Sequence, residues 1–522
     1  MRFTELYQEK IYGVISGLDR IRFRGTDRML SNKTGFRQAL NSMGVLFKDF
    51  GKWAEARTLA LRAQCAKQAK ALGIPTRYLF SSGVDKDALA REIAGEDGVA
   101  EDGSICMLSV MECCTAPTVV GDRETKRLSV EMRPRKCVYL YHYFDHPEVG
   151  FGHVRLQTWA PYTVNICLNG RHWLEKQLLA QGIEYVKVDN CFPWIADVSV
   201  AQHLMDAQLQ TSWPDLLNKL VLNLCPGLPA LCAPFEIQHY WSADQSEFAT
   251  DVMFHSAADL DKLFPVLVQH GMRVSDCKAV LRYFGRRQEH SSLGNVPQQV
   301  PSDCCRRHEG VRIKHWVNGD SIKLYNKAGG IVLRGETTIN NARNFKAFRP
   351  PNDDESKPCS WQKMRKGVND LHRRCEVSQK ANERYLDALS VAQVNQTLRD
   401  VCKDACNRTS KNERPVRGLN PWNKQDAHLL TFLAKGEWAL NGFRNKNLCR
   451  YLEPRFNELL PEERKKLSAK ATRLIGLLRA HGLIRKVSKE NRYLLTELGQ
   501  TFASALLIAG SIAVKQLTEM AA

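Results

Sequence analysis

The sequence predicts an α+β protein of several domains. At 522 residues the chain is too long for one hydrophobic core, and about three domains are expected. Its 43% hydrophobic and 25% charged residues are ordinary for a globular protein in water. Strand-like and helix-like periodicities also alternate in separate blocks along the chain. These blocks predict an N-terminal α/β domain (1–120), a central α+β domain with a mixed β-sheet (126–345), a basic helical linker region (346–418) and a domain of helices and one hairpin (419–522).

The N-terminal block alternates strands with helices. A β-branched segment in the second half of 11–26 predicts a strand, 45–74 follows a helical pattern, and a short strand beginning at Arg77 precedes a helix at 86–95. With 104–114 as the next strand, this order favours a small parallel sheet. Neither GxGxxG nor GxxxxGK[ST] occurs, so no dinucleotide or nucleoside triphosphate is implied.

The central block consists mainly of strands. Its clearest part is a meander of three strands, at 311–317, 321–327 and 331–339, joined by the tight-turn dipeptides Asn318-Gly319 and Gly329-Gly330. Side chains alternate along a strand, so in the right register one face of this meander gathers six polar residues. These are Arg312, Lys314, Lys323, Tyr325, Arg334 and Glu336. Such a face is a candidate nucleic-acid platform, or else the solvated outer face of an antiparallel sheet.

The linker region is polar at both ends. Residues 349–358 are expected to form a solvated loop, and the stretch from Trp361 to about Ala405 is expected to be helical, with a basic start. Residues 407–418 contain Pro415 and Gly418 and are expected to flex.

The last hundred residues predict a winged helix. Helical segments at 426–443, 444–452 and 462–483 are followed by two short strands, 483–487 and 493–495, and by a final helix. In the third helix the leucines share one stripe, and the cations lie largely off it, as a recognition helix requires. The expected nucleic-acid contacts on this helix and its hairpin are Lys466, Lys470, Arg473, Arg479, Arg485, Lys486, Lys489 and Arg492.

This C-terminal pattern resembles the winged helices of MarR-like and ArsR-like transcription regulators. The resemblance covers roughly residues 420–515, through a leucine-rich helix, the segment AHGLI, a basic hairpin and the segment LTELG. Residues 401–522 hold 22 Lys and Arg against 11 Asp and Glu, which is a surplus of 11 out of the chain's +19. This charge favours nucleic acid as the partner over a winged helix used for protein contacts.

Two further resemblances concern the body of the chain. Phrases at 153–178 and 189–195 resemble a family of bacterial hypothetical proteins that carry a C-terminal winged helix, which implies no activity. The phrase SIKLYNK at 321–327, followed by Arg334-Gly-Glu336, is similar to a strand pair of rolling-circle replication initiators of plasmids and filamentous phages. Those proteins cut one DNA strand with a tyrosine, aided by a metal.

The initiator resemblance implies a catalytic set. No HxH motif occurs in this chain, so a metal would need carboxylate ligands, for which Asp251 and Glu336 are the candidates, with Mg²⁺ or Mn²⁺ as the cofactor. Tyr325 and Tyr283 are the candidate nucleophiles. Asp19, Glu112 and Asp189 also adjoin apolar strands, where two-metal nucleases keep their carboxylates.

Other metal sites find less support in the sequence. His142, His146 and His153 crowd one predicted loop, where a metal site competes with a merely solvated loop. The 17 cysteines include no CxxC pair, so neither structural zinc nor disulfides are expected.

The overall hypothesis is a cytoplasmic nucleic-acid-binding protein of a bacterial mobile or accessory element. No signal peptide pattern or run of eighteen apolar residues is present, so no membrane partner is expected. DNA and structured RNA both remain open as partners, and a homodimer is possible. The alternatives are a metal-dependent nuclease or replication initiator, and a transcription regulator with a large sensing domain.

Overall fold

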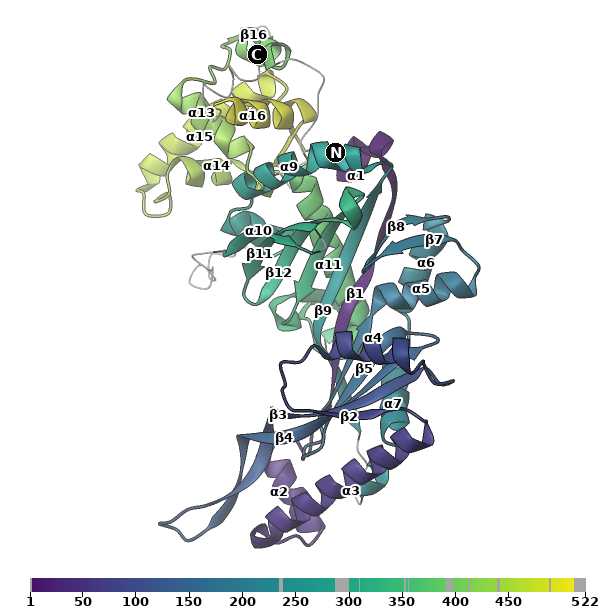
Figure 1. Ribbon diagram of the computed structural model, residues 1–522. Helices are drawn as coiled ribbons and strands as arrows, with labels where there is room; N and C mark the ends of the chain where they lie inside the picture. Colours follow the sequence, from purple (N-terminus) through teal and green to yellow (C-terminus); the bar gives the residue numbers. More distant parts are fainter. Residues whose placement is uncertain are drawn as a thin grey trace.

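A computed structural model describes residues 2–233, 238–286, 300–308, 310–351, 354, 356–390, 398–411, 414–438, 442–487 and 490–510 (Figure 1). Eleven strands form one mixed sheet in the order β10-β11-β12-β13-β9-β1-β6-β5-β4-β3-β2, in which only β2 and β3 pair in parallel. Their bounds are β1 Ile11–Asp27, β2 Thr76–Leu79, β3 Ser104–Gly121, β4 Leu128–His146, β5 Gly150–Gln157, β6 Val164–Asn169, β9 His239–Phe254, β10 Ser302–Arg307, β11 Gly310–Val317, β12 Asp320–Lys327 and β13 Val332–Ile339. The fold is therefore α+β, as predicted.

The sheet is built from two halves with the same strand order. In the first half, β1 pairs with β6, and β5, β4 and β3 follow outward; in the second, β9 pairs with β13, and β12, β11 and β10 follow outward. The two long strands β1 and β9 run antiparallel to each other at the centre, from Ile11↔Phe254 to Asp27↔His239. The two halves therefore have the same topology and are arranged as a pseudo-twofold repeat.

This arrangement changes the expected domain boundaries. The boundary expected between residues 120 and 126 falls in the turn of the β3–β4 hairpin, whose strands pair from Ser104↔Phe144 to Gly121↔Leu128. The N-terminal and central units therefore share one sheet, and the small parallel sheet is limited to the β2–β3 pair.

One face of the sheet, here called the apolar face, carries Phe23, Phe248 and Leu324 and is covered by helices. In the first half the covering helices are α2 (Lys33–Ser42), α3 (Phe50–Ala71) and α7 (Trp213–Leu224), and in the second half α9 (Ala257–Val274), α10 (Cys277–Tyr283) and α11 (Leu371–Leu389). Short helices α1 (Phe3–Leu6) and α8 (Leu228–Cys232) pack at their ends.

The opposite, polar face carries Arg22, Glu247, Asp251, Arg334 and Glu336. It is covered only in part, by α4 (Lys86–Glu96) and by a small layer of α5 (Gly170–Ala180), β7 (Tyr185–Val188), β8 (Cys191–Ile195) and α6 (Val198–Gln208). This layer packs tightly on β1, because a Cβ atom on Gly17 would lie 2.0 Å from Met205 Cε.

The expected linker region is largely part of the core. The segment from Trp361, expected as a helix, begins as β15 (Ser360–Lys363), which pairs with β14 (Lys346–Arg349). Among the described residues of this stretch, α11 and α12 (Leu398–Cys406) are helical as predicted. Arg374 of α11 is 2% exposed and donates to the carbonyls of Ala243 and Ile339, so its charge serves packing rather than a basic surface.

The C-terminal part has a hydrophobic core of its own. Its elements are α12 (Leu398–Cys406), β16 (Thr409–Lys411), β17 (Arg414–Val416), α13 (Lys424–Leu433), α14 (Asn445–Leu452), α15 (Pro461–Ala480), β18 (Ile484–Lys486), β19 (Tyr493–Leu495) and α16 (Glu497–Ala509). The first helix is shorter than predicted, because the chain leaves it after Leu433 for a single turn at Gly436–Trp438. No described helix combines the length and apolar character that a bilayer-spanning segment needs.

Candidate functional site on the polar face of the sheet

The register brings the six polar residues of the meander onto one face. Lys314 lies opposite Lys323, which lies opposite Glu336. Arg312, Tyr325 and Arg334 form the neighbouring row in the same way. The alternation predicted from the sequence is therefore confirmed, but five of these residues are buried and only Lys314 is partly exposed.

Asp251 is held between two arginines. Arg334 donates to Asp251 through Nε at 2.5 Å and through Nη2 at 2.9 Å, and Arg171 Nη2 lies 2.8 Å from Asp251 Oδ2. All three side chains are fully buried. Burial raises the pKa of Asp251, but Arg334 and Arg171 outweigh it, so the pKa is lowered overall. Asp251, expected as a metal ligand, is thus a structural counter-ion.

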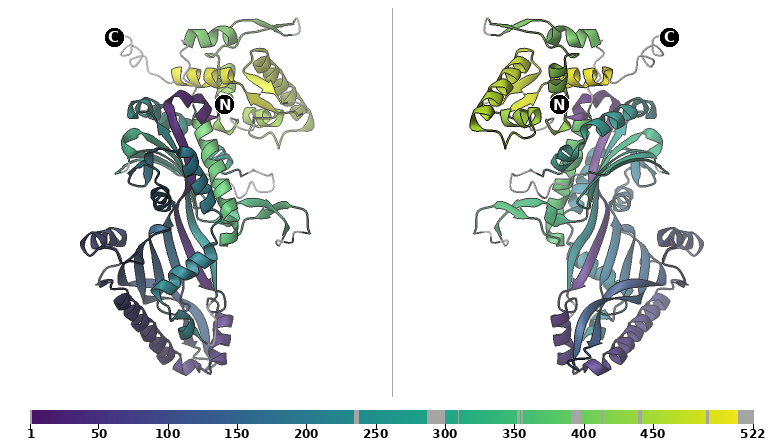
Figure 2. Two further views of the ribbon diagram at one scale, coloured as in Figure 1. Left: turned by 90° about the vertical axis from the view of Figure 1, so that its right-hand side faces the viewer. Right: turned by 90° about the vertical axis from the view of Figure 1, so that its left-hand side faces the viewer.

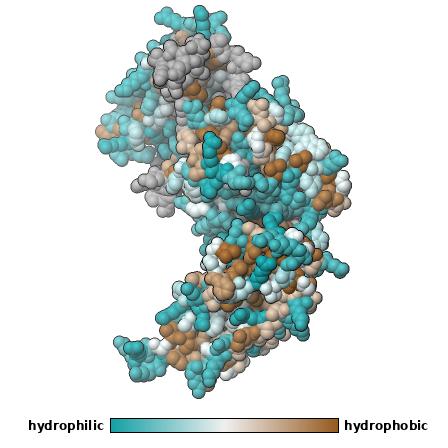
Figure 3. All heavy atoms as spheres, in the orientation of Figure 1, coloured by the Kyte–Doolittle hydropathy of each residue, from teal (hydrophilic) through white to brown (hydrophobic). Residues whose placement is uncertain are grey.

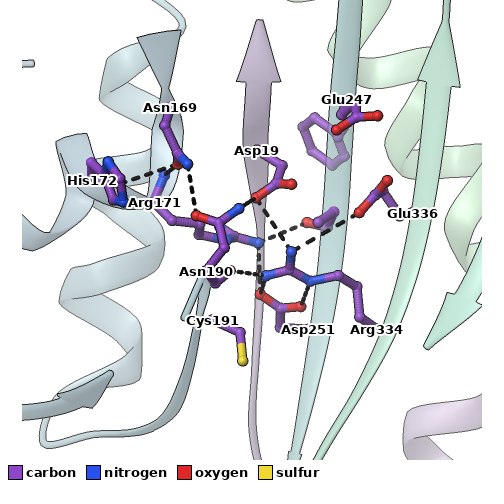
Figure 4. Close-up of polar contacts among 12 residues, drawn as sticks. Asp19, Asn169, Arg171, His172, Asn190, Cys191, Glu247, Asp251, Arg334 and Glu336 are labelled. Carbon is purple, nitrogen blue, oxygen red and sulfur yellow. Dashed lines mark hydrogen bonds and ion pairs between the residues drawn. The ribbon is translucent and has the colours of Figure 1, made fainter. Parts of the chain in front are cut away.

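Three other carboxylates, from the neighbouring strands β1, β9 and β13, converge beside this network (Figure 4). One oxygen each from Asp19, Glu247 and Glu336 lies within 4.8 Å of the others. Asp19 stands in a bulge of β1 between Leu18 and Ile21, opposite Glu247. Oxygen ligands at this spacing suit a hard cation such as Mg²⁺ or Mn²⁺.

An ammonium group already shares these carboxylates. Lys323 Nζ donates to Glu336 and, at 3.1 Å, to Glu247 Oε1. Desolvation and the nearby charge of Glu336 raise the pKa of Glu247, whereas for Glu336 the cations Lys323 and Arg334 outweigh desolvation and lower the pKa. Desolvation opposes the charge of Lys323, but the two glutamates raise its pKa overall. The site holds one positive charge between two carboxylates.

Asn190 and Arg334 position the third carboxylate. Asn190 Nδ2 donates to Asp19 Oδ1 at 2.5 Å, and Arg334 Nη1 lies 3.3 Å from the same oxygen. Asn169, which caps α5, in turn donates to Asn190 at 2.7 Å. These contacts hold Asp19 in place from β6, from the turn between β7 and β8, and from β13.

The two candidate tyrosines lie in different places. Tyr325 is on the polar face, in the row next to Glu336, and desolvation and Glu336 raise its pKa to about 12. Tyr283 is 1% exposed in the core on the apolar face, where its hydroxyl lies 3.3 Å from Ser275 Oγ. Only Tyr325 is near the carboxylates.

The polar face continues into the first half of the sheet as a row of arginines. Arg20, Arg22 and Arg24 are exposed and alternate with the buried Ile21 and Phe23. Alternate residues of a strand are about 7 Å apart. Of these arginines, Arg24 lies 3.8 Å from Asp244.

The remaining acidic candidates do not join the site. Arg155 donates to Glu112, and Tyr141 donates to the same carboxylate at 2.9 Å, so Glu112 is neutralised in the first half of the sheet. Asp189 has a positive φ of 52° in the turn between β7 and β8 and is exposed.

The three histidines expected to crowd one loop also separate. His142 Nε2 lies 3.0 Å from Ser104 Oγ, on the side of β4 opposite to His153. His146 Nδ1 accepts from the Glu148 amide at 3.1 Å. His153 faces Asp87 at 3.7 Å.

Most of the C-terminal cations are exposed. Lys466, Lys470, Arg473 and Arg479 of α15 and Arg485 and Lys486 of β18 form no ion pair among the described residues. Arg492 lies 2.9 Å from Glu490, and Lys489 lies outside the described residues. Since successive helix residues turn by about 100°, Arg479 lies about 140° around the helix from Lys466. Only Lys466, Lys470 and Arg473 share one side.

Comparisons with protein-family models, with curated proteins and with solved structures gave no match to this chain. Sequence reasoning found Glu336 and noted Asp19, but it missed Glu247 and Arg171. The spacing of Glu247 and Asp251 on one strand could have signalled Glu247, because residues four apart share a face.

Proposed function

We propose that this chain binds nucleic acid, DNA or structured RNA, through a C-terminal winged helix. The single observation that carries the proposal is the row of exposed cations Lys466, Lys470 and Arg473 on one side of α15, for which the described part of the chain provides no ion-pair partner. The opposite stripe, with Ala471, Ile475 and Leu478, is buried in the domain core. A helix held on one side and cationic on the other suits a groove lined by phosphates.

Two further features support a winged helix. The order α13, α14, α15, β18, β19, α16 is that of the motif, and an isolated antiparallel bridge pairs Phe443 with Tyr493 of the β18–β19 hairpin. Figure 3 shows mainly hydrophilic side chains over this part of the chain on the face drawn. Arg20, Arg22 and Arg24 provide a second basic surface on the sheet, in place of the buried cations of the meander.

The test is the salt dependence of binding. Each phosphate contact on a duplex contributes about 0.9 to the slope of log K against log salt, so Lys466→Ala, Lys470→Ala and Arg473→Ala together should lower the slope by about 2.7. A matched control changes three exposed lysines of α3, Lys52, Lys67 and Lys70, to Ala. An unchanged slope for the α15 variant, or an equal loss for the control, excludes α15 as the contact.

A second candidate function is metal-dependent cleavage of a phosphodiester at the polar face. It is favoured by the approach of Asp19, Glu247 and Glu336 within 4.8 Å of one another, with Tyr325 in the adjoining row. The three oxygens fit Mg²⁺ or Mn²⁺, which would supply charge for the reacting phosphate in place of the Lys323 ammonium. Tyr325 is then the candidate attacking group.

Cleavage is tested with labelled single-stranded and duplex DNA in the presence of Mn²⁺. Loss of cleavage in Glu247→Gln and Tyr325→Phe supports this function. Cleavage that persists in both variants rejects it. A binding-only protein shows no cleavage, while the α15 variants still change its affinity.

A further inference from the structure

The β14–β15 ribbon carries two aromatic rings in water. Phe348 is 59% exposed and Trp361 is 67% exposed, and the two are cross-strand partners with ring centroids 5.5 Å apart. The ribbon itself is firmly anchored, because Ala347 and Met364 are buried and the Met364 amide donates to the Phe345 carbonyl at 3.0 Å. A paired aromatic surface left outside the core marks a binding site more often than a single exposed ring does.

Two lysines complete the same surface. Lys346 and Lys363 lie opposite each other, two residues along the ribbon from the Phe348–Trp361 pair. Alternate residues of a strand share a face, so the lysines lie on the same outward face as the two rings, and both are exposed. Asp354, at the end of the ribbon, is paired with Lys357 at 3.0 Å. Like charges directly opposite each other are unfavourable in a sheet, and a polyanion relieves this repulsion.

The ribbon lies on the same side of the molecule as the proposed recognition helix. Figure 2 shows the green ribbon and the yellow-green α15 and its hairpin projecting from one side of the molecule. The ribbon and α15 are therefore accessible from the same side of the molecule.

We infer that Phe348 and Trp361 form a stacking platform for unpaired bases of a single-stranded nucleic acid, with Lys346 and Lys363 contacting the flanking phosphates. Every base has a π-face, so aromatic rings flanked by cations bind single strands with little regard to sequence. A duplex keeps its bases stacked inside and offers the rings nothing. The inference rests on the proposed function for the class of partner, and it adds a site and a preference for unpaired strands.

The test compares affinities of the full chain for a fluorescein-labelled oligothymidine and for a duplex of equal length, by fluorescence anisotropy. The double variant Phe348→Ala, Trp361→Ala should bind the single strand about 5- to 100-fold more weakly and leave the duplex affinity unchanged. Trp361→Phe keeps a ring and should retain most of the affinity. Phe80, which is 97% exposed on the other half of the chain, gives the control Phe80→Ala.

The outcomes separate this site from the proposed function. Unchanged single-strand affinity in the double variant, an equal loss for the duplex, or a loss in Trp361→Phe as large as in the alanine variant overturns the platform and leaves nucleic-acid binding by α15 standing. Failure of the unaltered chain to bind either probe overturns the proposed function, and the platform with it. Both rings are exposed, so unchanged circular dichroism of the variants is expected.

Discussion

Asp251→Asn tests whether the centre of the sheet is a structural ion network. The substitution keeps the shape of the side chain and removes the negative charge that Arg334 and Arg171 share. All three side chains are fully buried, and removing one partner of a buried ion pair costs about 3–5 kcal/mol, because the remaining charge is left without compensation. Asp19 remains 3.3 Å from Arg334 and still compensates part of its charge. The free energy of unfolding should therefore fall by about 3 kcal/mol, at the lower end of this range.

Urea unfolding followed by tryptophan fluorescence measures this loss. With a slope of about 3 kcal/mol per molar urea, the midpoint of the sheet's transition should fall by about 1 M. The matched control is Asp244→Asn on the same strand, where the carboxylate meets the half-exposed Arg24 at 3.8 Å and the expected change is within about 0.5 kcal/mol. An unchanged midpoint for Asp251→Asn refutes the structural role.

The same network predicts a pH dependence. The pKa of Asp251 is lower in the folded protein than the ordinary value of about 3.9, so its stabilisation is complete above that value and is lost as the pH falls through the lowered folded pKa. The Asp251→Asn variant should lose this part of its acid sensitivity. If Asp251→Asn lost metal-dependent cleavage and kept full stability, Asp251 would instead be a metal ligand.

Two further substitutions test other parts of the fold. Gly170→Ala places a Cβ atom 2.0 Å from the Leu18 carbonyl oxygen and should lower the free energy of unfolding by about 1–3 kcal/mol, whereas Gly51→Ala, with no atom within 4 Å, should be neutral or stabilising. Asp426→Ala removes the carboxylate that accepts two hydrogen bonds from Arg417, at 2.6 and 2.7 Å, and should increase proteolysis next to α13. Burial raises the pKa of Asp426, but the hydrogen bonds and charge of Arg417 outweigh this effect and lower the pKa overall. The unaltered protein should therefore become sensitive to proteolysis at this segment only at acid pH, where Asp426 is protonated. Unchanged cleavage of the Asp426 variant would show that this ion pair does not hold the segment.

The structural repeat explains where the carboxylates meet. Asp19 of β1 and Glu247 of β9 lie close together where the two equivalent central strands pair along the middle of the sheet. No internal repeat is visible in the sequence, although the two halves have the same strand order. The site therefore combines Asp19 from the first half of the sheet with Glu247 and Glu336 from the second.

Local features could be predicted from the sequence because they depend on neighbouring residues. The strands β11, β12 and β13, their turns at Asn318-Gly319 and Gly329-Gly330, and the alternation that gathers Lys323, Tyr325 and Glu336 follow from a period of two and from turn chemistry. The basic helix α15 follows from a period of 3.6.

Only the tertiary structure decided which polar residues are buried and which partners they have. Asp251, Arg334 and Arg171 are separated by scores of residues in sequence, and their pairing depends on β9, β13 and α5 packing together. In the same way, the segment at Trp361 was expected to be helical, but it pairs with β14 and forms a strand on which the Trp361 ring is exposed to solvent. The periodicity of a sequence predicts on which face of its helix or strand a side chain lies. The residues that surround this side chain come from other segments of the chain, and the local pattern carries no information about them.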